Sequence, residues 1–579
     1  MAGDVTELKV EASASAEYSI LELREHFRQA VASGEREVVI PPGDYRGTTK
    51  DKAFIEILGA RNLTIRAEGV RMICEKRTRA LTIADCEDLT IRGLVIDYDP
   101  LPFTQGTITA VGPDDAWVDV TIHEGYPLEP YRRIDIVDSN TRHRKYGMPF
   151  LWGTSAEMRS GGIVRITRKG GFGGVASVGD LASLATGSTM DGMAHAISIE
   201  YSARVALKDI TLHTAPGFGI VAGGGYGDHH YDNVRIVPGP PPAGATEGRL
   251  LTATWDAIQF NCLRKGPLVE NCVVMSAGDD TWSLSSRDFL FLATEGRRAW
   301  LVSRSEYVDK LEPGDRLTSS QAGPSVRIES LAKVRLDECP LSPELREKIR
   351  TAKPGAFYQF PLSKINEVML DSAPPWTPGT SLYSPDRNCS NFVLRNNTFH
   401  SSGRAGLING ASNGVIEGNT YLDVGTALSL YSNLPGGGAT GMANIIFRNN
   451  IIRGSGHWCP KPNSLDAGGA VSIYDTDMEG APAPPGVFRN ITIENNLFEN
   501  IRGVVILATS VDGLRITGNQ FVRCQIHPPL GDGKAKGVDE KALGWFRNTR
   551  NVTVEGNRVE DRGSFGERGF VGLQEGAEQ

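Results

Sequence analysis

The sequence predicts an all-β protein built as a right-handed parallel β-helix, with two small inserted β-barrel-like subdomains and an N-terminal capping helix. Three observations lead to this prediction. A strand-like phrase recurs along the chain, two segments interrupt the recurrence, and glycine accounts for 66 of 579 residues, which favours many turns over long helices. The chain is too long for one small core, so it forms one large domain or several smaller ones.

The recurring phrase has the pattern apolar-x-apolar-x-Asn/Gly-x-apolar. It alternates at period two, which is the spacing of a strand, and it is rich in Val, Ile, Thr and Phe. An ordinary β-sandwich would instead show hairpin turns about every 8–12 residues. Copies of the phrase begin at Asn62, Asp88, Val205, Asn233, Pro267, Asn391, Asn413, Asn444, Asn490, Gly513 and Asn551.

A second asparagine closes the later copies and sets the repeat length. The gaps between these asparagines are 22, 31, 46, 23 and 38 residues, and 46 is twice 23. A coil of about 22 residues with loops on some coils explains them most simply. One coil cannot bury its apolar side alone, but stacked coils share a continuous core, and stacked asparagines can hydrogen-bond as a ladder. The residues are Asn397, Asn419, Asn450, Asn496, Asn519 and Asn557.

The N-terminal segment predicts a cover for the first coil. Ser19 and Glu22 form a capping box, and Leu23, Phe27, Ala30 and Val31 follow at the spacing of one helix face. Gly34 is a suitable stop. Because an open coil end must be covered, we expect this helix to plug it.

Two segments that read as short antiparallel strands with tight turns break the repeat. We interpret them as subdomains inserted at turns of the coil. The expected divisions are an N-terminal cap at 1–48, β-helix at 49–105, an inserted subdomain at 106–192, β-helix with the acid-bearing coils at 193–287, a second inserted subdomain at 288–372, β-helix at 373–565 and a C-terminal tail at 566–579.

Charge and composition exclude several classes. The net charge is −8, so a nucleic-acid partner is disfavoured, and no apolar run is long enough for a transmembrane helix. The first residues lack the layout of a signal peptide, so we expect a cytoplasmic protein or one whose signal was removed. The eight cysteines have no zinc spacing and read as buried thiols or one or two disulfides.

Three aspartates stand out in the stretch from Trp255 to Ser286. Asp279 and Asp280 are adjacent, and Asp256 precedes Asp279 by 23 residues (279 − 256), about one coil. Asp256 and Asp279 should therefore lie one above the other, about 4.8 Å apart. Like charges this close raise one another's pKa. The cluster can be a solvated turn, a calcium site, or a carboxylate set for glycoside hydrolysis, in which one acid protonates the leaving oxygen and the others activate water.

A spacing of about 6.5–9.5 Å between the carboxyl groups would admit that water and give inversion. Physics alone does not choose which aspartate is the acid.

The order of a lone Asp, then an adjacent pair about one coil later, resembles the polygalacturonases of glycoside hydrolase family 28. Other stretches are similar to glycoside hydrolase family 110, over about residues 20–560. They are FTQGTI at Phe103, VRIVPGP at Val234, RKGPLVEN at Arg264, AGDD at Ala277 and EPGDRL at Glu312.

Family 110 comprises exo-acting, inverting α-1,3-galactosidases with a β-helix and inserted barrels. The resemblance implies that Asp279 is the general acid and that Asp256 and Asp280 position and deprotonate water. The Gly-His-Gly and Arg-x-Lys signatures of family 28 are absent after Asp280, which argues against polygalacturonate.

Other residues are candidates for substrate binding. Trp255 and Trp282 flank the acids and can stack on a sugar or pack the coil. Arg264 and Lys265 can neutralise the acids or meet an anionic sugar, or can be an exposed pair in a turn. His229 and His230 lie in the run DHHYD, which can face the substrate, form a plain turn or bind a metal. We expect His195, His213 and the asparagine ladder to be structural.

The predicted function is an exo-acting inverting glycoside hydrolase that removes a terminal sugar, most simply α-linked galactose. A polysaccharide lyase or epimerase and a non-catalytic carbohydrate-binding β-helix are the alternatives. The expected partner is a carbohydrate with a terminal sugar, with no membrane or nucleic acid involved. We expect no cofactor and no metal, and the sequence predicts no oligomeric state.

Overall fold

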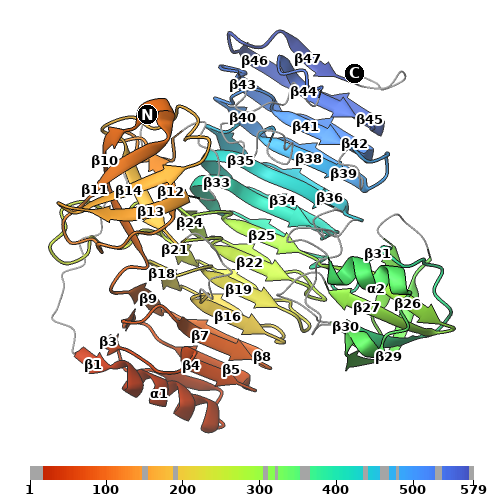
Figure 1. Ribbon diagram of the computed structural model, residues 1–579, viewed down its shortest axis with the longest axis horizontal. Coiled ribbons are helices and arrows are strands. Elements are labelled where there is room, and N and C mark those ends of the chain that lie inside the picture. The colour runs from red at the N-terminus through yellow and green to blue at the C-terminus, as the bar shows by residue number, and fades with distance from the viewer. Residues whose placement is uncertain are drawn as a thin grey trace.

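A computed structural model describes residues 17–145, 154–186, 194–303, 311–319, 324–351, 365–433, 441–456, 468–476, 482–528 and 537–572. The chain winds into a stack of parallel coils, from α1 at one end to β47 at the other (Figure 1). Each full coil contributes one strand to a twelve-stranded sheet and two to a 23-stranded sheet. The prediction of a parallel β-helix is confirmed.

The twelve-stranded sheet forms one side of the stack, and its neighbours pair in parallel. Its strands are β2 (Glu37–Val39), β5 (Arg61–Arg66), β8 (Glu87–Arg92), β17 (Ala206–Lys208), β20 (His230–Asp232), β23 (Leu268–Glu270), β32 (Val393–Arg395), β34 (Gly414–Glu417), β36 (Ala443–Arg448), β39 (Phe488–Glu494), β42 (Val511–Thr517) and β45 (Arg550–Glu555).

The 23-stranded sheet has two branches, because two long strands turn a corner and belong to both. The first branch contains β1 (Glu17–Ser19), β3 (Gly43–Gly47), β6 (Val70–Cys74), β9 (Val95–Tyr98), β18 (Thr211–Leu212), β21 (Arg235–Ile236), β24 (Val273–Met275), β33 (Thr398–Asn409), β35 (Thr420–Asn433), β37 (Ile451–Arg453), β40 (Leu497–Glu499), β43 (Gln520–Cys524) and β46 (Arg558–Arg562).

The second branch shares β33 and β35 with the first. Its other strands are β4 (Ala53–Leu58), β7 (Arg79–Ala84), β16 (Ile197–Glu200), β19 (Ile220–Gly223), β22 (Ile258–Asn261), β25 (Trp282–Ser285), β38 (Val471–Thr476), β41 (Ile506–Thr509), β44 (Ala542–Arg547) and β47 (Arg568–Val571). The corner between the two branches is where the predicted acids fall.

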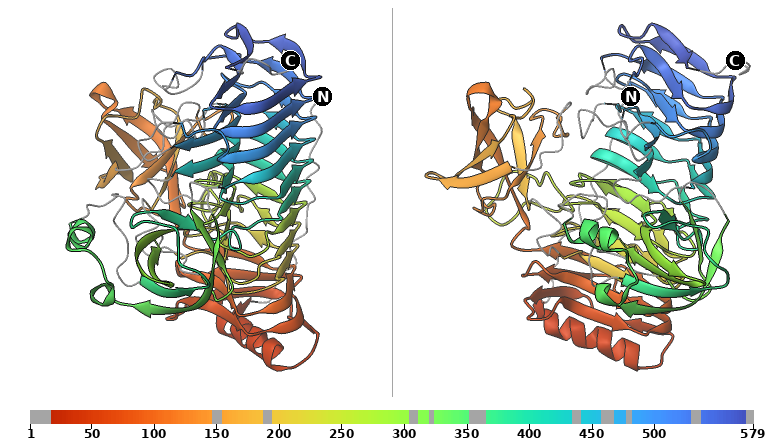
Figure 2. Two further views of the ribbon diagram at one scale, coloured as in Figure 1. Left: turned by 90° about the vertical axis from the view of Figure 1, so that its right-hand side faces the viewer. Right: turned by 45° about the vertical axis from the view of Figure 1, so that its right-hand side comes forward.

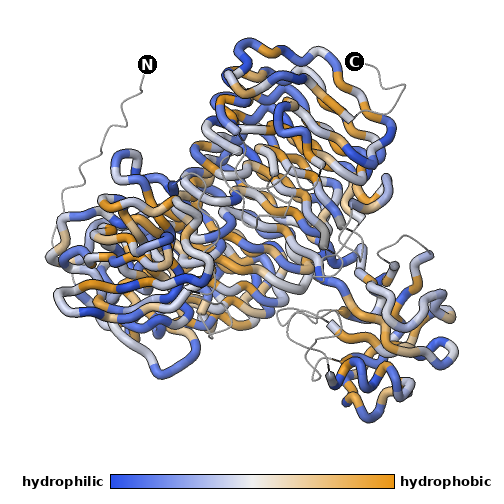
Figure 3. Tube along the Cα trace, turned by 45° about the horizontal axis from the view of Figure 1, so that its top comes forward, coloured by the Kyte–Doolittle hydropathy of each residue, from blue (hydrophilic) through white to orange (hydrophobic). Residues whose placement is uncertain are grey.

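One hydrophobic core runs the length of the stack. Leu63 on β5 pairs with Leu89 on β8, and both side chains are buried inside the coil. Because alternate side chains of a strand point inward, each coil adds a layer to the same core. Figure 3 shows apolar segments recurring from coil to coil.

The asparagine ladder forms as predicted at its buried positions. Asn397 Nδ2 donates to Asn419 Oδ1 at 2.9 Å, and Asn419 Nδ2 donates to Asn450 Oδ1 at 3.0 Å. The 46-residue gap is one coil with a long loop, not two coils, because Asn450 Nδ2 donates directly to Asn496 Oδ1 at 3.0 Å.

Helix α1 (Ile20–Ala32) covers the first coil, which confirms the predicted cap. Ile20, Leu23, Phe27 and Ala30 are buried against the core. The hydroxyl of Ser19 accepts from the backbone N–H of Leu21 at 3.2 Å, one residue before the expected Glu22.

The first insertion leaves the coil after β9 and is a six-stranded antiparallel sheet in the order β12-β15-β10-β11-β14-β13. Among the described residues its edge strands β12 and β13 do not pair, so this sheet stays open. Its strands are β10 (Phe103–Val111), β11 (Trp117–Ile122), β12 (Arg133–Val137), β13 (Thr154–Arg159), β14 (Ile163–Arg168) and β15 (Leu181–Ala185).

The second insertion follows β25 and is a closed barrel in the order β26-β27-β30-β29-β28-β31. It extends to Tyr383, beyond the expected 372, because β31 must pair with both β26 and β28 to close the barrel. Both insertions project from the stack at separate places (Figure 2). The elements are β26 (Asp288–Glu295), β27 (Arg298–Ser303), β28 (Arg316–Ser319), β29 (Val326–Val334), α2 (Pro343–Arg350), β30 (Ile365–Leu370) and β31 (Ser381–Tyr383).

Two further expectations concern cysteines and membranes. Seven of the cysteines are buried, and Cys459 lies outside the described residues. Within the described ranges, no helix combines the length and hydropathy that crossing a bilayer requires.

We predict that Asn419→Ala destabilises the coil by about 1–3 kcal/mol. The change removes Asn419 Oδ1, the acceptor of the buried backbone N–H of Asn397, and an unsatisfied buried group carries that cost. The midpoint of urea unfolding measures it. The exposed Asn140, replaced by Ala, is the control; equal midpoints for the two variants would show that the ladder does not stabilise the fold.

Candidate active site

The three aspartates converge at one corner of the stack. Asp256 directly precedes Ala257 and β22, and Asp279 and Asp280 precede β25 on the next coil. One carboxylate oxygen from each lies within 4.8 Å of the other two. The sequence spacing therefore brought the three acids together as expected.

The register of the two coils corrects one detail. Ile258 pairs with Trp282, so two residues earlier on each strand Asp256 lies opposite Asp280, not Asp279. The backbone N–H of Ala257 donates to the carbonyl of Asp280 at 2.9 Å, which extends the pairing back to the acids. The coil here is 24 residues long (280 − 256), one more than the expected 23.

Gly278 lets the acid pair approach its neighbours. A Cβ at this position would lie 2.2 Å from the carbonyl oxygen of Thr254 and 2.1 Å from Nη2 of Arg133. Glycine at this position therefore permits a close approach of the backbone to its neighbours.

Arg404 is a functional candidate that sequence reasoning missed. Its Nε and Nη2 donate to the two carboxylate oxygens of Asp280 at 2.7 and 2.8 Å. Trp282 pairs with Gly406, so Arg404 lies opposite Asp280 one coil further on. Phe218 occupies the same position one coil before Asp256. We call Phe218, Asp256, Asp280 and Arg404 the acid column.

A signal for Arg404 was present in the sequence. Cys272 occupies the ladder position below Asn397, because its N–H donates to Asn397 Oδ1 at 2.9 Å. Asp280 follows Cys272 by 8 residues, and Arg404 follows Asn397 by 7. Counting from the ladder across the second insertion would have placed Arg404 beside the acids.

Burial differs among the three carboxyl groups. Asp280 and Asp256 are 2% and 6% exposed, whereas Asp279 is only partly buried. Asp256 Oδ2 accepts from Gln259 Nε2 and from the Ser283 hydroxyl, both at 3.3 Å. Asp279 Oδ1 is itself buried and has no hydrogen-bond partner among the described residues. Because the residue as a whole is only partly buried, Asp279 is the acid most open to a substrate.

Burial and like charge raise the pKa of two of the acids. Burial and the neighbouring Asp280 raise the pKa of Asp279 to about 8, although Arg404, Arg133 and Arg144 oppose the shift. Burial, then Asp280 and Asp279, raise the pKa of Asp256 well above its usual range. The trio therefore retains a proton at neutral pH and can both donate and accept one.

The spacing of the whole carboxyl groups is a separate quantity from the 4.8 Å between their nearest oxygens. The separation of about 6.5–9.5 Å that inversion needs therefore stays a prediction. Asp256 and Asp280 are register partners on adjacent coils. The three acids could also ligate a cation, but Arg404 occupies both oxygens of Asp280, which favours proton transfer over a calcium site.

The first insertion packs against the acid-bearing coils through two buried arginines. Arg133 donates to the carbonyl of Thr254, and Arg144 Nη2 donates to the carbonyl of Gly278 at 3.0 Å. The buried carboxylate of Asp135 pairs with both, at 2.8 Å to Arg133 and 3.2 Å to Arg144. This triad positions the insertion directly beside Asp279.

A small cavity lies at this junction. Its walls come from the first insertion, including Arg142 and Arg144, and from the coil corner, including Ser276, Ala277 and Ser401. The three aspartates are not among its lining residues, but Ala277 is two residues from Asp279. The cavity therefore adjoins the acids without containing them.

The structure contradicts the stacking role of the tryptophans. Trp282 is 1% exposed and packs inside the coil against Gly406, whose Cβ would lie 2.2 Å from the ring. Trp255 is 3% exposed, with Arg133 over its ring at 5.3 Å and Phe218 at its edge. Neither ring offers a face to a sugar, because the coil and the insertion cover both.

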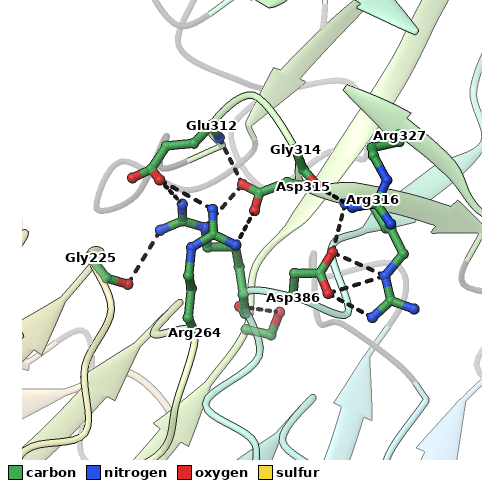
Figure 4. Close-up of polar contacts among 10 residues, drawn as sticks. Gly225, Arg264, Glu312, Gly314, Asp315, Arg316, Arg327 and Asp386 are labelled. Atoms are coloured by element: carbon green, nitrogen blue, oxygen red, sulfur yellow. Dashed lines mark hydrogen bonds and ion pairs between the residues drawn. The ribbon is translucent and has the colours of Figure 1, made fainter. Parts of the chain in front are cut away.

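Arg264 and Lys265 have partners other than the three acids, and Figure 4 shows those of Arg264. Arg264 Nη1 lies 2.8 Å from the buried carboxylate of Asp315 on the barrel insertion, and Lys265 Nζ lies 2.9 Å from Asp228. Asp315 also accepts from Arg387 Nε at 3.0 Å. These ion pairs favour a structural role, in which Arg264 joins the barrel to the coil and Lys265 pairs with Asp228, so substrate binding by this pair stays a prediction.

The two histidines lie on the twelve-stranded sheet, away from the corner of the acids. His229 is buried, and its Nδ1 accepts from the N–H of Val205 at 3.2 Å. His230 Nε2 lies 2.8 Å from Glu270 Oε1. These contacts correct their assignment to substrate binding, since a different face of the coil holds them.

Known proteins that are similar to this chain include a β-helix family and a carbohydrate-active enzyme. Residues 380–521 match the family model described as "Right handed beta helix region". Alpha-1,3-galactosidase B of Akkermansia muciniphila is 22% identical over 545 residues, which cover 87% of this chain. The resemblance expected from the sequence is confirmed. The chain spans 61% of the length of that relative.

Two solved structures are similar to this chain at low identity. One is a hyperthermoactive exopolygalacturonase from Thermotoga maritima, with 12% identity, a TM-score of 0.41 and coverage of 93% of this chain and 91% of that one. The other is the catalytic unit of a GH87 alpha-1,3-glucanase from Streptomyces thermodiastaticus, with 11% identity, a TM-score of 0.41 and coverage of 97% and 69%.

We predict that the stability of the wild type falls relative to Asp279→Asn as the pH rises. The folded-state pKa of Asp279, about 8, exceeds its ordinary 3.8, so folding binds a proton. The resulting stabilisation is complete below the unfolded pKa and is lost as the pH approaches about 8. Denaturant unfolding of both proteins at about pH 5 and pH 8 measures the difference.

Asp512→Asn is the matched control for this pH series. Arg550 and Asn551 lower the pKa of Asp512, so its contribution is already present above the unfolded pKa and stays constant over the same pH window. A wild-type minus Asp279→Asn difference that is equally constant would contradict the raised pKa of Asp279.

Proposed function

We propose that this protein is an exo-acting, inverting glycoside hydrolase that removes a terminal α-linked galactose from an oligo- or polysaccharide. The observation that carries the proposal is the convergence of three carboxylates at one corner, with a protonated and partly exposed acid among them. The name of the Akkermansia relative, an α-1,3-galactosidase, supports the choice of sugar and linkage.

In this proposal Asp279 is the general acid. Its pKa of about 8 keeps it protonated at neutral pH, and its exposure lets it reach the glycosidic oxygen. As the bond between the anomeric carbon and that oxygen breaks, the proton of Asp279 passes to the leaving group. The Asp279 carboxylate is then ionised and must regain a proton before the next cycle.

Asp256 and Asp280 hold and activate the water. Asp280 is fixed by two charge-assisted hydrogen bonds from Arg404, so it serves as an oriented acceptor. Asp256 is the base: when the proton shared by the coupled acids lies on Asp279, Asp256 is ionised and takes the proton of the water as its oxygen attacks the anomeric carbon. Arg404 is a positioning residue in this scheme, because it acts through Asp280.

The cavity beside the acids supports exo action. The first insertion supplies one of its walls, and Arg133, Asp135 and Arg144 fix that wall to the acid-bearing coils. A walled cavity favours a chain end over an internal segment of a polymer, which would need an open groove.

The product of the reaction tests the proposal directly. We expect galactose alone to be released from oligosaccharides with a terminal α-1,3-linked galactose, and proton NMR at early times to show the β-anomer first. Inversion follows because water attacks from the face opposite the leaving group. Initial α-anomer would mean a carboxylate nucleophile, and a series of internal fragments would exclude exo action.

Replacing each aspartate by asparagine separates their roles. Each variant should lower kcat by about 10²–10⁴-fold, the usual contribution of general acid–base assistance. Asp279→Asn should lose least on a substrate with a very good leaving group, which needs little protonation, whereas Asp256→Asn and Asp280→Asn should lose as much on either substrate.

Asp512→Asn, on β42, is the control and should keep wild-type turnover. Circular dichroism and unfolding midpoints establish that each variant is folded. Near-normal activity in any one of the three active-site variants would remove that residue from the catalytic set.

A further inference from the structure

A second group of ionisable side chains lies where the first insertion meets the coil. His143 comes from the first insertion, and His400 and Asp423 come from the adjacent strands β33 and β35. One donor atom from each lies within 4.8 Å of the other two. None of these residues belongs to the acid column or to the proposed mechanism.

The distances within this group match the edges of a metal coordination shell. His143 Nδ1 lies 3.3 Å from Asp423 Oδ2, and His400 Nε2 lies 3.6 Å from the same oxygen. Ligands at about 2.0–2.1 Å from a tetrahedral ion are separated by about 3.3 Å. Two imidazoles and a carboxylate are also the donor set that Zn²⁺ and related divalent cations bind.

The backbone holds two of these donors at the coil corner. Asp423 has a positive φ of 50°, a conformation that Asp tolerates better than most residues. Gly454 lies against it on the next coil, where a Cβ would come within 2.5 Å of Asp423 Oδ1. His400 directly precedes Ser401, which has the same conformation one coil earlier, with φ of 52°.

The loop that carries His143 is also fixed. The N–H of Asp138 donates to the carbonyl of His143 at 2.9 Å, and the N–H of Arg142 donates to the carbonyl of Asp138 at 2.8 Å. His143 and His400 then meet with their ring centroids 4.7 Å apart and nearly perpendicular. The three donors therefore converge from the first insertion and from two adjacent coils.

A comparable group on the twelve-stranded sheet is less suited to a metal. His230, Asp232 and Glu270 also lie within 4.8 Å of one another. There, however, Arg395 Nη2 lies 2.7 Å from Glu270, and a guanidinium charge at a carboxylate ligand opposes a cation.

We propose that His143, His400 and Asp423 bind one divalent transition-metal cation of the zinc type, which joins the first insertion to the coil. The adjacent residues Arg142, Arg144 and Ser401 line the cavity beside the acids. The ion thus fixes one wall of that cavity. This site does not rest on the proposed hydrolase function, since its donors and its test are independent of turnover.

Zinc binding to the chelator-stripped protein tests the site. Isothermal titration calorimetry should show one equivalent of Zn²⁺ bound to the wild type, and zinc should raise its thermal unfolding midpoint, because the ion binds only the folded arrangement. Co²⁺ in the same site should give visible absorption bands of a tetrahedral ion. If neither Zn²⁺ nor Co²⁺ binds to the stripped protein, the proposal is wrong.

Three variants locate the ion. His143→Ala, His400→Ala and Asp423→Asn should each weaken zinc binding by at least the 10–100-fold that loss of even an outer-shell partner causes. Asp423→Asn retains a residue that tolerates a positive φ, and metal-free unfolding curves report whether each variant folds. His143→Ala changes only a loop of the insertion, so it keeps the test valid if a coil variant unfolds.

His230→Ala is the matched control from the other histidine group. It should bind zinc with wild-type affinity. If His230→Ala abolishes binding while the three variants retain it, the ion lies on the twelve-stranded sheet and the proposed site is wrong.

Discussion

The parallel register of the coils is the constraint on which the rest of the structure depends. Backbone hydrogen bonds hold each residue opposite one residue of the next coil, at about 4.8 Å. That register places Asp256 opposite Asp280 and Asp280 opposite Arg404, whatever their side chains prefer. Arg404 follows Asp280 by 124 residues, yet the inserted barrel leaves the pairing intact because the chain rejoins the stack where it left it.

The register holds three carboxyl groups close together although their negative charges repel one another. Desolvation and like charge act in the same direction on Asp256 and Asp279, so both hold protons more tightly than isolated aspartates. Arg404 compensates one carboxylate and leaves the others short of positive charge. Such an arrangement costs stability, and protein folds retain such costs mainly where the strained groups have a chemical role.

The two insertions attach to the coil by the same physical device. In each, a buried carboxylate joins two arginines: Asp135 joins Arg133 and Arg144, and Asp315 joins Arg264 and Arg387. Arg133 and Arg144 also donate to backbone carbonyls of the acid-bearing coils. Breaking a buried ion pair leaves an uncompensated charge, at a typical cost of about 3–5 kcal/mol, so each insertion is held in one orientation. The first insertion can therefore serve as a fixed wall beside the acids.

The sequence by itself determined the coil, its cap and the meeting of the three aspartates. The signals for these features are local: period-two patterns, the asparagine ladder and the helix face at Leu23 and Phe27. Local patterns can be read from the order of residues along the chain. The one-coil spacing of Asp256 and the Asp279–Asp280 pair is a consequence of that same repeat.

Only the tertiary structure decided which way side chains point and what they meet across long separations. The side chain of Trp282 is buried inside the coil. Arg264 forms an ion pair with Asp315, and Arg404 donates hydrogen bonds to Asp280. A shift of one residue reverses the face of a strand side chain, and a coil of 24 residues in place of 23 is such a shift. The meeting of His143 with Asp423 needs the docking of a whole insertion, which no repeat length encodes.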